Sequence, residues 1–452
     1  MSETETLLLG QVLDIHTDPF ATAPEAAARH ERHGAVLIRN GLIAATGPAE
    51  ALRAAHPRAR MIDHGAGLIL PGFVDAHAHY PQTAIIASWG KRLIDWLDSY
   101  TYPEEMRFSD PAHAGAIAAR HLDLLLAHGT TSVASFCTIH PASVTAFFEA
   151  AAARNMAVVA GRTCMDRNAP AGLCDDARSA HDESAALIGA WHNRGRARYA
   201  ITPRFSPTST PEQLEALGAL WAAHPDCLMQ THLSEQEDEV AWVRALYPDR
   251  RDYLDTYEAH GLLGPGAMFG HAIWLSDDEH ARLHDSGAAL IHCPTSNTFI
   301  GSGLFDTARA KREGQVVGLA TDTGGGSSFS MLRTMASAYE VAQLRGSALH
   351  PAQLLWLATA GSARALRAEA RIGTLETGTE ADLAVLDLAS TPAIAQRAAR
   401  AETVWEAVFP TIMMGDDRAI AATYVAGQCM QVPEAGDHSR KVNPLIADSL
   451  GL

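Results

Sequence analysis

The chain has 452 residues, of which 47% are hydrophobic, 19% charged and 6% aromatic, a composition typical of a globular protein with a large core. Its 35 basic and 52 acidic residues give a net charge of −17, so nucleic-acid backbones and anionic membranes are poor partners. No stretch approaches the ~20 continuous apolar residues that a membrane-spanning helix needs.

The first residues and the cysteines indicate a reducing compartment. The chain begins with an acidic segment that lacks the basic region of a signal peptide. The six cysteines are widely scattered and form no C-x-x-C pair. We therefore expect a cytoplasmic protein with reduced cysteines.

Both ends of the chain are predicted to form short strands. Near the start, apolar runs at residues 7–12 and 35–39 are followed by a hairpin signal at Asn40-Gly41. Near the end, residues 382–387 and 421–428 show a similar pattern. A single small β-sandwich domain, built from residues 1–70 and 373–452, accounts for both ends. Two unrelated appendages are the alternative.

The middle of the chain, residues 71–372, alternates between strand and helix patterns. Helix boundaries are marked by Asp110-Pro111, by capping-box patterns beginning at Thr210 and Ser276, and by Gly129, Gly287 and Gly314. Eight strands alternating with helices predict a (β/α)₈ barrel. A doubly wound open sheet is the alternative, but no G-x-G-x-x-G motif supports it. The predicted strands are 73–79, 130–135, 157–163, 198–205, 227–232, 267–272, 288–293 and 316–322.

Polar side chains end several of these strands. His77 and His79 close the first strand and share one of its faces, because side chains alternate along a strand. His232, His271 and Asp322 end the fifth, sixth and eighth strands. The carboxyl ends of barrel strands carry the active sites of such enzymes, so we expect these side chains to meet.

Imidazole and carboxylate groups are the ligands of a catalytic zinc site, which keeps one position open for water. Glu235 lies three residues after His232, within reach of the same place, and could move protons between water and substrate. The predicted fourth strand, 198–205, contains no lysine. A two-metal site bridged by a modified lysine is thereby disfavoured, and one metal ion is expected.

In these motifs the chain resembles the amidohydrolase superfamily and, within it, the guanine deaminases. The superfamily-wide features are the H-A-H strand end, the single histidines on strands five and six, and the aspartate on strand eight. More specific are Pro81-Gln82, one residue after the H-A-H segment, and the T-P-R-F segment that ends at Phe205. Further matching segments are 96–103, 231–235, 292–297 and 321–331. The resemblance spans roughly residues 66–385.

The resemblance implies a role for each matched position. The metal ligands would be His77, His79, His232 and Asp322. His271 would contact the reacting water or the tetrahedral intermediate, with direct ligation the less favoured reading. Glu235 would shuttle protons to the purine ring, and Asp322 would also accept a proton. Three further residues would hold the base: Gln82, Arg204 and Phe205.

The implied activity is zinc-dependent hydrolytic deamination of guanine to xanthine and ammonia, in purine catabolism or salvage. One Zn²⁺ per subunit is expected, although Fe²⁺ suits the same ligands. The resemblance also implies a homodimer. One alternative is a related aminohydrolase or chlorohydrolase acting on a triazine, pterin or adenine-like ring. Another is a non-catalytic barrel serving as a scaffold, which would be expected to have lost ligands or the acid.

Overall fold

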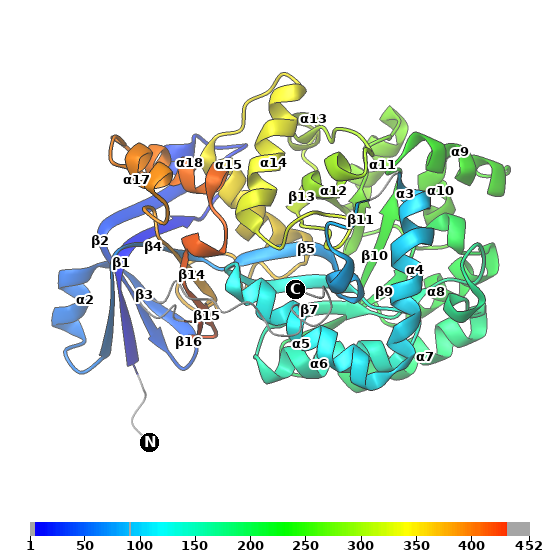
Figure 1. The fold of residues 1–452 in the computed structure, drawn as a ribbon, viewed down its shortest axis with the longest axis horizontal. Helices are drawn as coiled ribbons and strands as arrows, with labels where there is room; N and C mark the ends of the chain where they lie inside the picture. Colours follow the sequence, from blue (N-terminus) through cyan, green and yellow to red (C-terminus); the bar gives the residue numbers. More distant parts are fainter. Residues whose placement is uncertain (1–4, 90–91, 432–452) are drawn as a thin grey trace, which may run out of the picture.

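The computed structural model describes residues 5–89 and 92–431. Strands from the two ends of the chain form one seven-stranded sheet, in the order β16-β15-β14-β4-β1-β2-β3. The β1–β4 pair is parallel and the other neighbours are antiparallel. Figure 1 shows the blue N-terminal strands beside the orange C-terminal elements. The prediction of one joint unit is confirmed. The strands are β1 (Glu5–Ile15), β2 (Ala28–Arg39), β3 (Leu42–Pro48), β4 (Arg60–Pro71), β14 (Leu383–Leu386), β15 (Ile420–Val425) and β16 (Gln428–Gln431).

Alternating apolar side chains explain how this sheet buries both of its faces. Leu7 packs with Leu37 on one side, whereas Leu8 packs with Val36 on the other. The predicted Asn40-Gly41 turn joins β2 to β3, and both of its residues have positive φ, 52° and 79°. Such a turn follows the right-handed twist of the two strands that it connects.

Eight parallel strands form the barrel, in sequence order around its wall. Two backbone hydrogen bonds join the segment after the last strand to the first: Asp322 N–H donates to the His77 carbonyl (2.9 Å) and His79 N–H to the Thr323 carbonyl (2.5 Å). The predicted (β/α)₈ barrel is confirmed, and the open sheet is excluded. The strands are β5 (Phe73–His79), β6 (Thr130–Phe136), β7 (Ala157–Gly161), β9 (Ala197–Pro203), β10 (Leu228–Leu233), β11 (Ala267–His271), β12 (Ala289–His292) and β13 (Val316–Leu319), with β8 (Thr163–Cys164) paired to β9.

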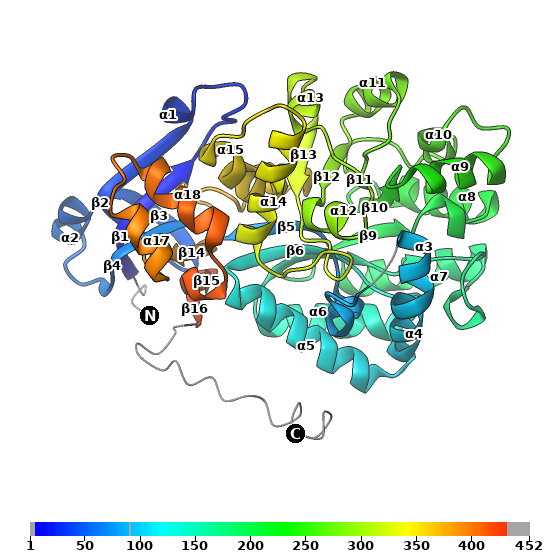
Figure 2. The same cartoon turned by 45° about the horizontal axis from the view of Figure 1, so that its top comes forward.

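Helices surround the barrel and flank the small sheet (Figures 1 and 2). Those of the barrel are α5 (Pro111–Ala127), α6 (Pro141–Ala153), α7 (Ala177–Trp191), α8 (Pro211–Ala223), α9 (Glu237–Leu246), α10 (Tyr253–Glu258), α11 (Asp277–Ser286), α12 (Pro294–Phe299), α13 (Thr307–Arg312), α14 (Met331–Leu344), α15 (Pro351–Trp356) and α16 (Ser362–Ala365). The small domain carries α1 (Pro24–Ala27), α2 (Ala49–Ala55), α17 (Pro392–Ala398) and α18 (Val404–Met414).

The predicted helix caps are present, with one difference. Asp110 caps α5, and Ser276 and Glu279 form a reciprocal capping box at the start of α11. Thr210 accepts the Gln213 N–H at the start of α8, but the return bond is missing. The Gln213 amide instead donates to Asp175 at 2.6 Å, so a tertiary partner has replaced the local one.

The strand ends nearest the site depart from the predicted boundaries. β9 ends at Pro203 and β13 at Leu319, so Arg204 and Asp322 lie on the turns that follow these strands. His271, Asp322 and Ser234 have left-handed backbone conformations, with φ of 67°, 49° and 50°. Residues other than glycine adopt this conformation at a cost, and such residues concentrate at functional sites.

Candidate active site

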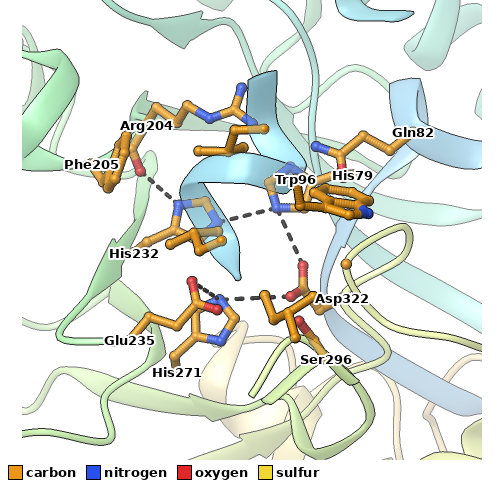
Figure 3. A pocket seen from close by; sticks show the side chains of 14 residues that line it. His79, Gln82, Trp96, Arg204, Phe205, His232, Glu235, His271, Ser296 and Asp322 are labelled. Carbon is orange, nitrogen blue, oxygen red and sulfur yellow. Dashed lines mark hydrogen bonds and ion pairs between the residues drawn. The ribbon is translucent and has the colours of Figure 1, made fainter. Parts of the chain in front are cut away.

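Three histidines converge inside the carboxyl end of the barrel. His77 and His79 come from β5 and share its inner face, and His232 comes from β10. The Nε2 atoms of His79 and His232 are 3.1 Å apart, and all three side chains are at most 9% exposed. One ring nitrogen from each lies within 4.8 Å of those of the others. The predicted convergence of these histidines is therefore present in the structure, and Figure 3 shows two of them, His79 and His232.

Asp322 reaches the same cluster from the turn after β13. Its Oδ1 atom lies 3.4 Å from Nε2 of His77 and 3.3 Å from Nε2 of His79. Burial opposes ionisation of Asp322, but its contacts with the two histidines outweigh burial and hold its pKa well below the usual range. The cluster therefore contains one carboxylate anion among three imidazoles.

The tautomer of His232 and the lowered pKa values of His79 and His232 suit these side chains to bind a divalent cation. Nδ1 of His232 lies 2.7 Å from the Arg204 carbonyl, which only accepts, so Nδ1 carries the proton and Nε2 keeps a lone pair. Burial lowers the pKa of His79 to about 4 and that of His232 well below its ordinary value. Nε2 of His77 is buried with no hydrogen-bond partner. Neutral imidazoles with unshared lone pairs are what Zn²⁺ requires.

A second grouping of potential ligand atoms joins His77, His271, Cys293 and Asp322. Burial raises the pKa of the Cys293 thiol well above its ordinary value, and the thiol donates to the Ile291 carbonyl at 3.6 Å. A thiol has to lose its proton to ligate a metal. The three-histidine set with Asp322 is thus the better cation site.

His271 and Glu235 face one another beside Asp322. Nε2 of His271 lies 3.5 Å from a Glu235 oxygen and 3.7 Å from Oδ2 of Asp322. On its other side, Nδ1 of His271 donates to Oδ1 of Asn297 at 2.8 Å, which leaves the lone pair of Nε2 directed at the carboxylates. Asn297 was not singled out from the sequence as a residue of the site. It lies on α12, and only the fold brings it to His271.

Glu235 is buried in surroundings that favour its neutral form. It is 3% exposed, and the Ser302 hydroxyl donates to its Oε1 atom at 2.7 Å. Burial, followed by the charge of Asp322, raises its pKa to about 8. A cation bound among the histidines would counter part of this increase. A carboxyl group with a pKa near neutrality can both give and take a proton.

Glu239, four residues after Glu235 and in the first turn of α9, holds the loop that carries Glu235, the candidate acid. Its Oε2 atom accepts the backbone N–H groups of Glu235 (2.8 Å) and Gln236 (3.0 Å), and its Oε1 atom accepts the Tyr253 hydroxyl (2.6 Å). Gln236 and Glu239 form a capping box at the start of α9. That three-residue spacing was the sequence signal that could have identified Glu239.

The three candidate base-holding residues lie at the opposite edge of the same pocket. Gln82 and Arg204 are 2% and 4% exposed, and both donate to the buried carboxylate of Glu105. Phe205 packs edge-on to His232, with ring centroids 6.4 Å apart. Glu105 was missed in the sequence because it belongs to a different segment, 23 positions after Gln82.

The pocket, counted together with its mouth that opens to solvent, contains about 430 Å³ of empty space. The segment from 92 to 105 covers one side with α3 (Leu93–Trp96), a π-helical turn (Leu97–Thr101) and α4 (Tyr102–Glu105). Trp96 from α3 lines the pocket, and Figure 3 shows it overlapping His79 in that view. The lining residues are His79, Gln82, Leu93, Trp96, Leu97, Arg204, Phe205, His232, Glu235, His271, Ser296, Ile300, Asp322 and Gly325.

A (β/α)₈ barrel with this histidine–aspartate set at its carboxyl end defines the class of metal-dependent hydrolases. The family model described as "Amidohydrolase family" matches residues 68–430. A bacterial imidazolonepropionase-like composite domain matches residues 34–59. The guanine deaminase of Escherichia coli (strain K12) is 41% identical over 404 residues, which cover 89% of this chain and 92% of that protein.

Solved structures of guanine deaminases have the same fold as this chain. The guanine deaminase of Bradyrhizobium japonicum is 36% identical, with a TM-score of 0.92 over 95% of this chain and 100% of that one. The guanine deaminase of C. acetobutylicum, solved with guanine in its active site, is 25% identical, with a TM-score of 0.84 over 94% of this chain and 100% of that one. The chain belongs to the amidohydrolase family and, within it, to the guanine deaminases.

No helix in the described ranges, 5–89 and 92–431, is long and apolar enough to cross a membrane.

Proposed function

We propose that the protein catalyses the hydrolytic deamination of guanine to xanthine and ammonia, in purine catabolism or salvage. One observation carries this proposal. A single pocket joins the histidine–aspartate cluster, a buried carboxyl group with a pKa near 8, and the Gln82–Arg204–Phe205 edge. The relatives named above, one of them solved with guanine in its active site, support the same substrate.

Four residues would hold the metal: His77, His79, His232 and Asp322. One Zn²⁺ per chain fits their nitrogen and oxygen donors, and Fe²⁺ fits the same set. When bound, the metal supplies the Lewis acidity that lowers the pKa of a water from ~16 to about 7, so that hydroxide is available at neutral pH. His271, whose Nε2 lone pair faces Glu235 and Asp322, would accept a hydrogen bond from the reacting water and so orient its oxygen.

The side chains around the cluster would carry the protons. Asp322 accepts one proton from the water that adds to C2, the carbon bearing the exocyclic amine. Glu235 gives its proton to N3, so that C2 becomes tetrahedral without a charge accumulating on the ring. Asp322 then gives its proton to the amine, and the deprotonated Glu235 takes the proton of the C2 hydroxyl as the C2–N bond breaks, so that ammonia leaves, C2 keeps a carbonyl oxygen and both carboxyl groups return to their starting states. The balance is guanine plus water to xanthine plus ammonia.

The opposite edge of the pocket would hold the base. Guanine presents O6 and N7 as acceptors, which suit the guanidinium of Arg204. The Gln82 amide both donates and accepts, as the N1–H and carbonyl of a 6-oxopurine require. Phe205 offers a ring face for stacking, an interaction of about 1–3 kcal/mol per base.

The proposal extends to a homodimer in the cytoplasm. The family resemblance supports the dimer, and the scattered cysteines support a reducing compartment. Light scattering of the purified protein tests the dimer, for which a mass of one chain would be the contrary result.

The function is tested by offering the zinc-loaded protein guanine, adenine, cytosine, a pterin and an aminated triazine in parallel and measuring ammonia release. A clear preference for guanine is expected. Turnover of another ring in preference would keep the hydrolytic chemistry and overturn the roles of Gln82, Arg204 and Phe205. No turnover of any ring with metal bound would contradict the proposal.

A further inference from the structure

Glu105 is a buried carboxylate that joins the two polar residues proposed to hold the base. It ends α4, within the segment that covers the pocket, and is 1% exposed. Its Oε1 atom accepts Nε2–H of Gln82 at 2.9 Å, and its Oε2 atom accepts Nη1–H of Arg204 at 2.6 Å. Both partners line the pocket, whereas Glu105 stands behind them.

The contact of residue 105 with Gln82 and Arg204 requires two hydrogen-bond acceptors at position 105. Gln82 and Arg204 both approach with donors, and a carboxylate offers one oxygen to each. The Gln82 amide is also held from its other end, because the Gly324 N–H donates to its Oε1 atom at 3.3 Å. Its nitrogen and oxygen therefore cannot exchange places without losing both contacts.

Glu105 also provides the counter-charge for Arg204. Arg204 is 4% exposed, and its guanidinium lies over the Tyr102 ring at 5.7 Å. Burial disfavours the charged guanidinium, but the Glu105 carboxylate, together with Tyr102 and Asp322, outweighs burial, and the pKa of Arg204 lies above its ordinary value. A buried cation that loses its partner moves or draws in water.

From these contacts we propose that Glu105 is a positioning residue that sets the pocket's preference for a 6-oxopurine edge. This inference rests on the proposed function. An amide at position 105 has a single acceptor, so its NH₂ group would oppose a donor of Gln82 or of Arg204. Either the Gln82 amide turns over or the Arg204 guanidinium shifts, and in both cases the donors and acceptors that face O6 and N1–H are rearranged.

Glu104, the preceding residue, provides a matched control. It is also buried (7% exposed) and lies on the same element, but its partners are Arg107 (2.8 Å) and His113 (3.0 Å). It contacts neither of the base-holding residues. Glu104→Gln therefore removes a buried charge from the same helix and leaves the contacts of Glu105 in place.

The experiment compares zinc-loaded wild type, Glu105→Gln and Glu104→Gln by calorimetry with two probes. Hypoxanthine carries the 6-oxo edge but lacks the amine, so it is not consumed, and unsubstituted purine lacks both. We expect the wild type to prefer hypoxanthine. In Glu105→Gln that preference should fall at least about tenfold, the effect of losing one charged hydrogen bond, and stay unchanged in Glu104→Gln. The KM for guanine should rise more than kcat falls, at equal metal content.

Several results would overturn the inference. One is an unchanged preference in Glu105→Gln, and another is an equal loss of affinity for both probes. If Glu105→Gln does not fold, the affinity for hypoxanthine relative to that for purine is measured in Glu105→Asp instead. Aspartate keeps the charge and both acceptor oxygens, but its side chain is shorter. An undiminished preference for hypoxanthine in Glu105→Asp also overturns the inference. A wild type that binds neither probe and releases no ammonia from guanine would instead refute the proposed function itself.

Discussion

Replacing Glu235 by glutamine tests the proton-shuttle role with little disturbance of the structure. At the pKa of about 8 that burial and Asp322 give it, Glu235 is largely neutral at pH 7 before a cation is bound, and an amide resembles a neutral carboxyl in shape. The Ser302 hydroxyl can still donate to the remaining carbonyl oxygen, as it does to Oε1 of Glu235 at 2.7 Å. We therefore expect Glu235→Gln to fold and to bind metal normally.

The expected loss of turnover is large because no neighbouring group can replace the acid. Glu239, the next buried carboxylate, is occupied by the N–H groups of Glu235 and Gln236 and by the Tyr253 hydroxyl. A positioned general acid contributes roughly 10²–10⁴-fold, so kcat should fall by at least about 10², or close to 3 kcal/mol.

The assay is xanthine formation from guanine at matched metal content, with Glu237→Gln as control, since Glu237 is exposed and two residues further along.

The pH profile provides a second readout of the role of Glu235. Glu235 acts as an acid, so activity is lost as pH rises and its proton leaves. The alkaline limb of the wild-type profile should have its midpoint no higher than about 8, because a bound cation only lowers that value. Near-normal turnover in Glu235→Gln, or an alkaline limb that persists unchanged in its residual activity, would refute the role.

Four further outcomes are expected. Arg204→Ala should raise the KM for guanine at least about tenfold with metal content unchanged, and unchanged guanine kinetics would remove Arg204 from the base-holding set. Asn297→Ala should lower kcat about 10–100-fold, because His271 loses the acceptor that fixes its tautomer; wild-type activity would show that His271 needs no such partner. Glu239→Gln should destabilise the fold by about 1 kcal/mol in urea unfolding, because the amide oxygen can still accept the two N–H groups but the Tyr253 hydroxyl loses its acceptor, and an unchanged midpoint would contradict the importance of that contact. Removal of the metal by a chelator should abolish turnover and lower the melting temperature, with both restored by Zn²⁺; a melting temperature that does not respond to Zn²⁺ would contradict the site.

The metal-ligand candidates could be predicted from the sequence because strand geometry alone places them. His77 and His79 alternate on one strand, and His232 and Asp322 come at or after the ends of others, so closing the barrel brings them to one edge. The two β-rich ends were also predictable as one unit, because both show the same pattern of short strands on either side of the alternating middle of the chain.

The supporting residues could not be predicted, because their partners depend on the paths of loops. Glu104 and Glu105 are chemically identical neighbours, yet one contacts Arg107 and His113 and the other contacts Gln82 and Arg204. Only the direction of the short helix α4 decides between them. Asn297 likewise reaches His271 from α12, and Ser302 reaches Glu235 from the turn that follows this helix. The left-handed conformation of Asp322 is another property of the fold, set by its contacts with β5.

The central claim is that one metal ion held by the histidine–aspartate cluster makes this chain a guanine deaminase. The most direct test is to titrate Zn²⁺ into chelator-treated protein and follow xanthine and ammonia formed from guanine. Both products should appear in equal amounts, and the rate should rise linearly and level off at one metal ion per chain. Full activity without metal, a plateau at two ions per chain, or no xanthine at any zinc concentration would contradict it.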